Sequence, residues 1–244
     1  MRKLISLLVV CVLAMSLSGC RNTNNPTPND PIEREEPHSP SGEDEIVLKK
    51  PNIYLYGYDG DVKVKFGKDI EERLICTYPE YNNGWNLSAN KTGELLDDKG
   101  NSYQYLFWEG KSNHDYRVTD GFCVKGSETA EFLNEKLTIL GLNDKERDDF
   151  ITYWLPDMVR NPWNIISFKT DEYDEYTELN VFPAPKNKVR ILMVWYPWMT
   201  KLTMNEQVLT PVEIDRNEKT VVEWGGLQVG ELGGFDNDNK NHIH

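Results

Sequence analysis

Cysteine and histidine are scarce in this sequence, and their scarcity excludes several kinds of site. The chain has 4 Cys and 4 His in 244 residues, with no Cys-x-x-Cys pair and no Cys-x-His spacing. Zinc sites depend on such spacings, so the sequence predicts no metal site and no cofactor. It also lacks a Gly-x-Ser-x-Gly elbow, a His-Glu-x-x-His motif and a glycine-rich phosphate loop.

Basic residues are outnumbered by acidic ones. The formal net charge is −13, and removal of Arg2 and Lys3 with a cleaved leader would lower it to −15. Binding to nucleic acid phosphates requires clustered Lys and Arg. The charge therefore predicts no nucleic acid partner and no electrostatic attachment to an anionic membrane surface.

A long hydrophobic run is present only at the N-terminus, in residues 4–17, and it is short for a membrane span. The run ends in Leu17-Ser18-Gly19-Cys20, which matches the lipobox of bacterial lipoproteins. Residues 1–20 are thus predicted to be a lipoprotein signal peptide, with Cys20 carrying acyl chains such as palmitate. Several acyl chains anchor a protein stably, because each buried methylene contributes about 0.8 kcal/mol. The predicted location is the extracytoplasmic face of a bacterial membrane.

Two cysteines remain once Cys11 leaves with the signal peptide and Cys20 carries lipid. Cys76 and Cys123 both stand in apolar segments that are typical of strands. Outside the cell they can form a disulfide, or they can remain two buried thiols. The sequence leaves both alternatives open.

The composition divides the rest of the chain into three parts. Residues 21–46 are rich in Asn, Pro, Asp and Glu and have few apolar side chains, so we expect a disordered acidic tether. Residues 47–227 are long enough for one α+β domain with a single core. Residues 228–244 are expected to form a flexible tail.

The order of the predicted elements indicates the fold class. Short strand-like segments fill residues 53–125, and glycine- and asparagine-containing turns separate them. Helical spacing follows in residues 127–142, and a second helix begins after Asn143, with Glu146 completing a capping box. Strands return after Pro162. Strands, a helical hairpin and strands again predict an α+β fold with a largely antiparallel sheet. We expect the hairpin to lie on one face of the sheet and Pro156 to kink or end its second helix.

Three segments in this pattern resemble a known family: KPNIYLYG from Lys50, YLFWEG from Tyr105 and VVEWGG from Val221. They are similar to motifs in a family of bacterial secreted or lipid-anchored proteins whose activity is uncharacterised. The resemblance covers residues 49–227. It implies one intact domain outside the cytoplasm, and it carries no catalytic residues over to this chain.

The segment YLFWEG combines aromatic side chains with a carboxylate, as sugar-binding surfaces do. On a strand, Tyr105 and Glu109 would share one face, and Trp108 would lie on the other. A ring can cover the apolar side of a sugar while a carboxylate accepts hydrogen bonds from its hydroxyls, and a ring face also attracts cations. The predicted binding residues are Tyr105, Trp108, Glu109, Trp85 and Trp224. In the alternative interpretation the strand is buried on both sides and Glu109 lies at its exposed end.

A second carboxylate, Glu223 in VVEWGG, allows a catalytic hypothesis. If the last strand lies beside the YLFWEG strand, Glu109 and Glu223 can serve as acid and base, or acid and nucleophile, in glycoside cleavage.

Three functions therefore remain open, and the sequence does not decide whether the protein is an enzyme. The first is a lipid-anchored binding domain for a glycan, an envelope component or a protein. The second is a cell-wall or polysaccharide hydrolase that uses the Glu pair. The third is a structural or interaction lipoprotein without a small-ligand site.

Overall fold

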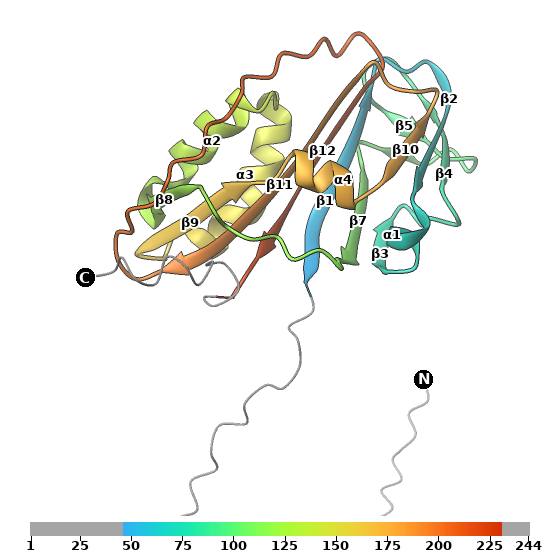
Figure 1. Cartoon of the computed structure of the whole chain (residues 1–244). Helices are drawn as coiled ribbons and strands as arrows, with labels where there is room; N and C mark the ends of the chain where they lie inside the picture. The colour runs from blue at the N-terminus through green and yellow to red at the C-terminus, as the bar shows by residue number, and fades with distance from the viewer. Residues whose placement is uncertain (1–45, 231–244) are drawn as a thin grey trace, which may run out of the picture. The chain divides into compact units, whose positions relative to one another are not determined.

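The structure is a computed structural model that describes residues 46–230. The predicted signal peptide, nearly all of the predicted tether and most of the predicted tail lie outside these residues. The described chain forms three layers, in which a helix pair packs on a seven-stranded sheet and a five-stranded sheet covers the other face (Figure 1). Within residues 46–230 no helix is both long and apolar enough to cross a membrane.

The large sheet contains the three segments that carry the family resemblance. Its strand order is β3-β7-β1-β12-β11-β9-β8, and every neighbouring pair is antiparallel except β11 with β12. The strands are β1 (Val47–Tyr56), β3 (Leu74–Tyr78), β7 (Leu106–Lys111), β8 (Phe122–Lys125), β9 (Trp163–Phe168), β11 (Asn187–Trp198) and β12 (Thr220–Gln228).

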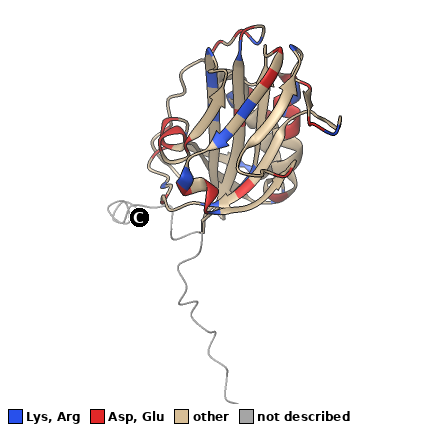
Figure 2. Ribbon diagram, turned by 90° about the vertical axis from the view of Figure 1, so that its right-hand side faces the viewer, with Lys and Arg blue, Asp and Glu red and all other residues tan. Residues whose placement is uncertain are grey.

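The small sheet has the order β10-β2-β4-β5-β6 and is antiparallel throughout. Its strands are β2 (Gly60–Phe66), β4 (Trp85–Ala89), β5 (Leu95–Leu96), β6 (Ser102–Tyr103) and β10 (Leu179–Phe182). Alternation in β2 buries Val62 and Val64 against the large sheet and leaves Lys63 in solvent. Basic and acidic residues alternate along the ribbon on this side of the molecule (Figure 2).

The helix layer consists of α2 (Thr129–Ile139), which follows a 3-10 turn (Gly126–Glu128), and α3 (Asp144–Met158). The predicted capping box is present: the Glu146 N–H donates to the Asn143 side chain at 2.9 Å, and the Asn143 N–H donates to the Glu146 carboxylate at 2.8 Å. The helix continues two residues beyond Pro156, so of the two expected effects, a kink or an end, the proline does not end the helix at its own position. The remaining helices are short: α1 (Lys68–Glu71) and α4 (Asp171–Tyr176).

A long crossover was not foreseen from the sequence. Because β11 and β12 are parallel, the chain between them must return along the whole length of the sheet. Residues 199–219 do so without a helix, and the segment runs along α2 (Figure 1). There the Val212 N–H donates to the Ile139 carbonyl at 2.8 Å.

Apolar side chains form two clusters, one on each face of the large sheet. One cluster fills the space between the two sheets and includes Leu55, Val64 and Trp108. The other lies between the large sheet and the helices and includes Phe150 and Trp224. The α+β class predicted from the order of elements is confirmed, whereas the division of the strands into two sheets was not predicted.

Candidate functional site

The strand β7 has two different faces, as its alternating sequence predicts. Leu106 and Trp108 are completely buried, while Phe107 and Glu109 are only partly buried. Trp108 points into the core between the two sheets. Phe107 pairs with Asn52 of β1, which in turn pairs with Trp224 of β12, so Phe107 and Glu109 belong to the helix side of the sheet.

The buried face of β7 leads to a charged cluster built around Glu223. One carboxylate oxygen, Oε1, accepts hydrogen bonds from Trp108 Nε1 at 2.8 Å and from the Tyr173 hydroxyl at 3.0 Å. The other oxygen, Oε2, accepts from Arg190 Nε at 2.5 Å. Arg190 also donates to the Thr177 carbonyl and to Asp174, the latter at 3.1 Å. The cluster thus joins β7, β11, β12 and α4 inside the protein.

These contacts determine the charges within the cluster. Burial lowers the pKa of the Arg190 guanidinium, but the charge of Glu223, together with Tyr173 and the hydrogen bonds to Glu223 and Asp174, outweighs burial and raises the pKa above its ordinary value. Burial first, and then the Glu223 charge, raise the pKa of Tyr173 well above its ordinary value. Arg190 and Glu223 therefore form a buried ion pair, with Tyr173 as a neutral donor.

Two more residues of the predicted binding site belong to the core. Trp85 is buried, and its Nε1 donates to the Pro79 carbonyl at 2.8 Å. Trp224 is completely buried under α3, with its ring centre 5.1 Å from that of Phe150. Together with Trp108, all three predicted tryptophans are enclosed, so none of them can stack on a ligand at the surface.

The two carboxylates of the catalytic hypothesis are not brought together. Ile53 of β1 pairs with Glu223 on one side and with Leu106 on the other, so the β1 strand separates the two carboxylate-bearing strands. Glu223 shares the inner face with Leu106, whereas Glu109 lies on the opposite face of the sheet. In a glycosidase both carboxylates flank the glycosidic bond that is cleaved. Glu109 and Glu223 lie on opposite faces of the sheet and cannot do so.

The remaining predicted residues, Tyr105 and Glu109, form a partly exposed surface on the helix side of the sheet. We call this surface the aromatic platform and define it by five residues: Lys50, Tyr105, Phe107, Glu109 and Tyr153. The ammonium of Lys50 lies 5.5 Å from the Tyr105 ring centre, 5.0 Å from that of Phe107 and 5.6 Å from that of Tyr153. The sequence motif identified Tyr105 and Glu109 but gave no sign of Tyr153, which comes from α3.

Glu109 is held next to these rings by the backbone. Its Oε1 accepts a hydrogen bond from the Lys50 N–H at 3.2 Å. Burial raises the pKa of Tyr153, and the negative charges of Glu109 and Asp157 raise it further. The Glu109 charge therefore also interacts with the Tyr153 hydroxyl. No Lys, Arg or His side chain among the described residues makes an ion pair with Glu109, and its carboxylate retains capacity to accept hydrogen bonds.

Cys76 adjoins the platform on the edge strand β3, where it pairs with Glu109. Burial and the Glu109 charge raise the pKa of the Cys76 thiol, which lowers its reactivity. Cys76 and Cys123 are both free, on strands at opposite edges of the seven-stranded sheet. With strands about 4.8 Å apart, they are far beyond disulfide reach. The structure has free thiols, but Cys76 is exposed and Cys123 is only partly buried, so the expectation that both thiols are buried is wrong.

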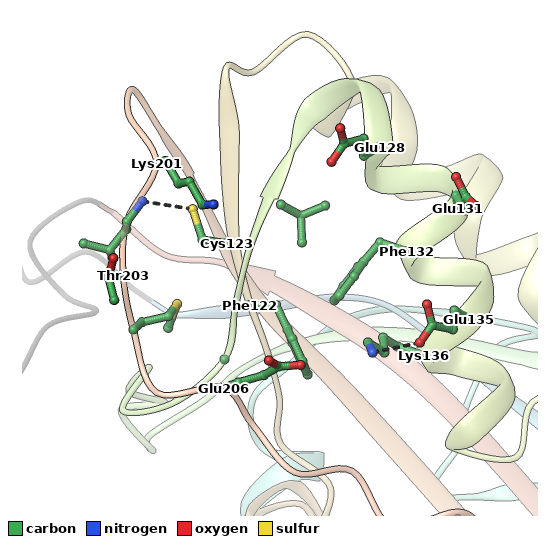
Figure 3. A pocket seen from close by; sticks show the side chains of 14 residues that line it. Phe122, Cys123, Glu128, Glu131, Phe132, Glu135, Lys136, Lys201, Thr203 and Glu206 are labelled. Carbon is green, nitrogen blue, oxygen red and sulfur yellow. Dashed lines mark hydrogen bonds and ion pairs between the residues drawn. The ribbon is translucent and has the colours of Figure 1, made fainter.

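Other polar groups lie away from the platform. The helix α4 carries several acidic residues, and a carboxylate oxygen of one of them, Glu172, lies 2.5 Å from Nε2 of His114. An open pocket of about 630 Å³ lies between β8, α2 and residues 201–206 (Figure 3). Glutamates surround it, and none of the predicted site residues lines it. Within residues 46–230 no cluster of three or more Cys, His, Asp or Glu is arranged to hold a metal ion.

Comparison with known proteins gives one partial relative. A Butyrivibrio fibrisolvens protein described as an uncharacterized protein in the bglA 3′ region is 40% identical to this chain over 63 residues. The match covers 25% of this chain and 65% of that protein. No protein-family model matches the chain, and no solved structure matches it. The chain is thus similar to a bacterial protein, and the similarity carries no activity.

Proposed function

We propose that this protein is a bacterial lipoprotein, anchored through Cys20, whose folded part binds a glycan outside the membrane through the aromatic platform. The lipobox at Leu17–Cys20 supports the anchor. The observation that supports the binding site is a group of partly exposed rings beside Glu109, whose carboxylate is not ion-paired among the described residues. Tyr153 is 36% exposed, and the neighbouring Tyr78 of β3 is 64% exposed.

A glycan fits this surface better than other ligand classes. Sugar rings have an apolar face that packs on aromatic side chains and hydroxyls that donate to a carboxylate such as Glu109. Large aromatic side chains gathered on a partly exposed face are consistent with an interaction site. The separation of Glu109 from Glu223 supports binding over hydrolysis by this pair of glutamates.

The test is a glycan and cell-wall-fragment binding screen with the full chain purified in detergent. For any glycan that binds, we expect Glu109→Gln to weaken binding roughly tenfold or more, because a hydrogen bond to a charged group contributes about 1.5–3 kcal/mol. Tyr105→Ala should weaken it as well, through loss of the ring.

Two variants serve as matched controls. Glu213→Gln removes an exposed carboxylate from the crossover, and Phe182→Ala removes a ring that is 59% exposed on the small sheet. Both should bind like the parent. The proposal is wrong if the platform variants also fold and bind like the parent, or if no glycan or wall fragment binds at all.

A further inference from the structure

The backbone of Lys50 is strained, and the strain places its side chain on the platform. Lys50 has φ of +57°, in the left-handed region that glycine and asparagine tolerate best. It also precedes Pro51, a position where extended backbone is favoured. The pairing of β1 shifts register between Lys49 and Asn52, so Lys50 lies in an irregular part of the strand. Such strain in a non-glycine residue is a reason to look for a function.

The strained residue directs an ammonium group into a cluster of rings. Phe107, Tyr105 and Tyr153 have their centres within 5.0 to 5.6 Å of Lys50 Nζ. These distances are typical of cation–π contacts, and several rings around one ammonium form an aromatic cage. Within residues 46–230 no carboxylate lies at ion-pair distance from this ammonium, so the rings supply its close contacts.

A second ammonium, that of Lys145, also lies against this group of rings. Lys145 Nζ lies 5.0 Å from the Tyr54 ring centre and 5.7 Å from that of Tyr105. Unlike Lys50, it is ion-paired, with Asp149 at 2.7 Å. Tyr105 therefore lies between two cations, one of which has no carboxylate partner in the described chain.

The electrostatics around the cage also favour a cation. Glu109 is bound to the N–H of Lys50, next to the rings, and has no ion pair among the described residues. The net charge of −13 raises the concentration of cations near the surface and lowers that of anions. An acidic glycan would be repelled, whereas a positively charged one would be attracted.

We propose that the platform binds a glycan that carries free amino groups, and that the ammonium of the ligand takes the position among Tyr105, Phe107 and Tyr153 that Lys50 occupies in this structure. This inference rests on the proposed function and names its ligand class. Lys50 then acts as an internal competitor for the cage. Glu109 lies beyond ion-pair distance of that position, so its negative charge adds a longer-range attraction for the ligand ammonium.

The experiment compares a short glucosamine oligomer with its fully N-acetylated counterpart, which has the same backbone and no charge. With the full chain in detergent, we expect the amino form to bind at least tenfold more tightly, with an affinity that falls as salt increases. Lys50→Gly should strengthen binding of the amino form about three- to tenfold, because it empties the cage. Glycine also suits the left-handed backbone, so this variant should fold at least as stably as the parent.

Lys99→Ala and Asp98→Asn are the charge controls, since each changes the net charge by one unit at an exposed turn on the small sheet. Each should change the affinity less than twofold. Equal binding of both oligomers, or an affinity for the amino form that Lys50→Gly leaves unchanged or weakens, would overturn the inference and leave the proposed function standing. If neither oligomer binds while another glycan does, only the inference fails. If no glycan binds, both fail.

Discussion

Replacing Arg190 with methionine is expected to lower the free energy of unfolding by about 3–5 kcal/mol. Arg190 and Glu223 form a buried ion pair at 2.5 Å, with 1% and 0% of their side chains exposed. Removal of the guanidinium leaves the Glu223 carboxylate inside the protein with only Trp108 and Tyr173 as donors. An uncompensated buried charge is among the most destabilising changes a single substitution can make. Equilibrium unfolding in denaturant measures the loss.

A double variant and a surface control complete this test. Arg190→Met together with Glu223→Leu should recover part of the loss, because it removes the uncompensated charge. Lys186→Met breaks an exposed pair with Glu218 and should change stability by less than about 1 kcal/mol. If Arg190→Met lowers the free energy of unfolding by less than about 1 kcal/mol, Arg190 and Glu223 do not form a buried ion pair.

Replacing Trp108 with alanine is expected to cost about 3–5 kcal/mol of stability, as for other large aromatic residues in cores. Trp108 is completely buried, with its ring centre 4.7 Å from that of Phe66 on the opposing sheet. The substitution leaves a cavity between the sheets and removes a hydrogen bond to Glu223. Denaturant unfolding of the purified variant checks the value.

The neighbouring Tyr105→Ala provides the contrast for this prediction. Tyr105 is only partly buried, so its removal should cost much less than that of Trp108. The two variants thus separate the roles of the core-facing Trp108 and of the platform residue Tyr105, which immediately precedes β7. Loss of binding in Trp108→Ala would reflect loss of the fold, whereas loss in Tyr105→Ala would reflect the platform. Similar unfolding free energies for the two variants would contradict the assignment of faces.

Local patterns in the sequence predicted much of the fold. The capping box at Asn143 and Glu146, the helical spacing that follows Ser127 and the alternation in β2 all involve near neighbours along the chain. They predicted elements that the structure contains. The α+β class followed from their order.

The arrangement of the strands depends on contacts between distant parts of the chain, which no local pattern encodes. The sequence indicated that YLFWEG and VVEWGG are strands, but not that β1 lies between them. Both faces of β7 carry aromatic side chains, so alternation alone could not tell which face enters the core. The tryptophans looked suitable for binding for the same reason that they suit the core, namely their large apolar area. Tyr153 and Lys50 join the platform only through the packing of α3 and the irregularity in β1.

The most direct test of the opposite placement of Glu109 and Glu223 is carboxyl labelling of the native full chain with a carbodiimide and an amine, read by mass spectrometry. We predict that Glu109 is labelled in the native state, whereas Glu223 is labelled only after denaturant has unfolded the protein. Labelling of Glu223 in the native state at the rate of the exposed Glu213 would contradict the account, as would protection of Glu109 equal to that of Glu223.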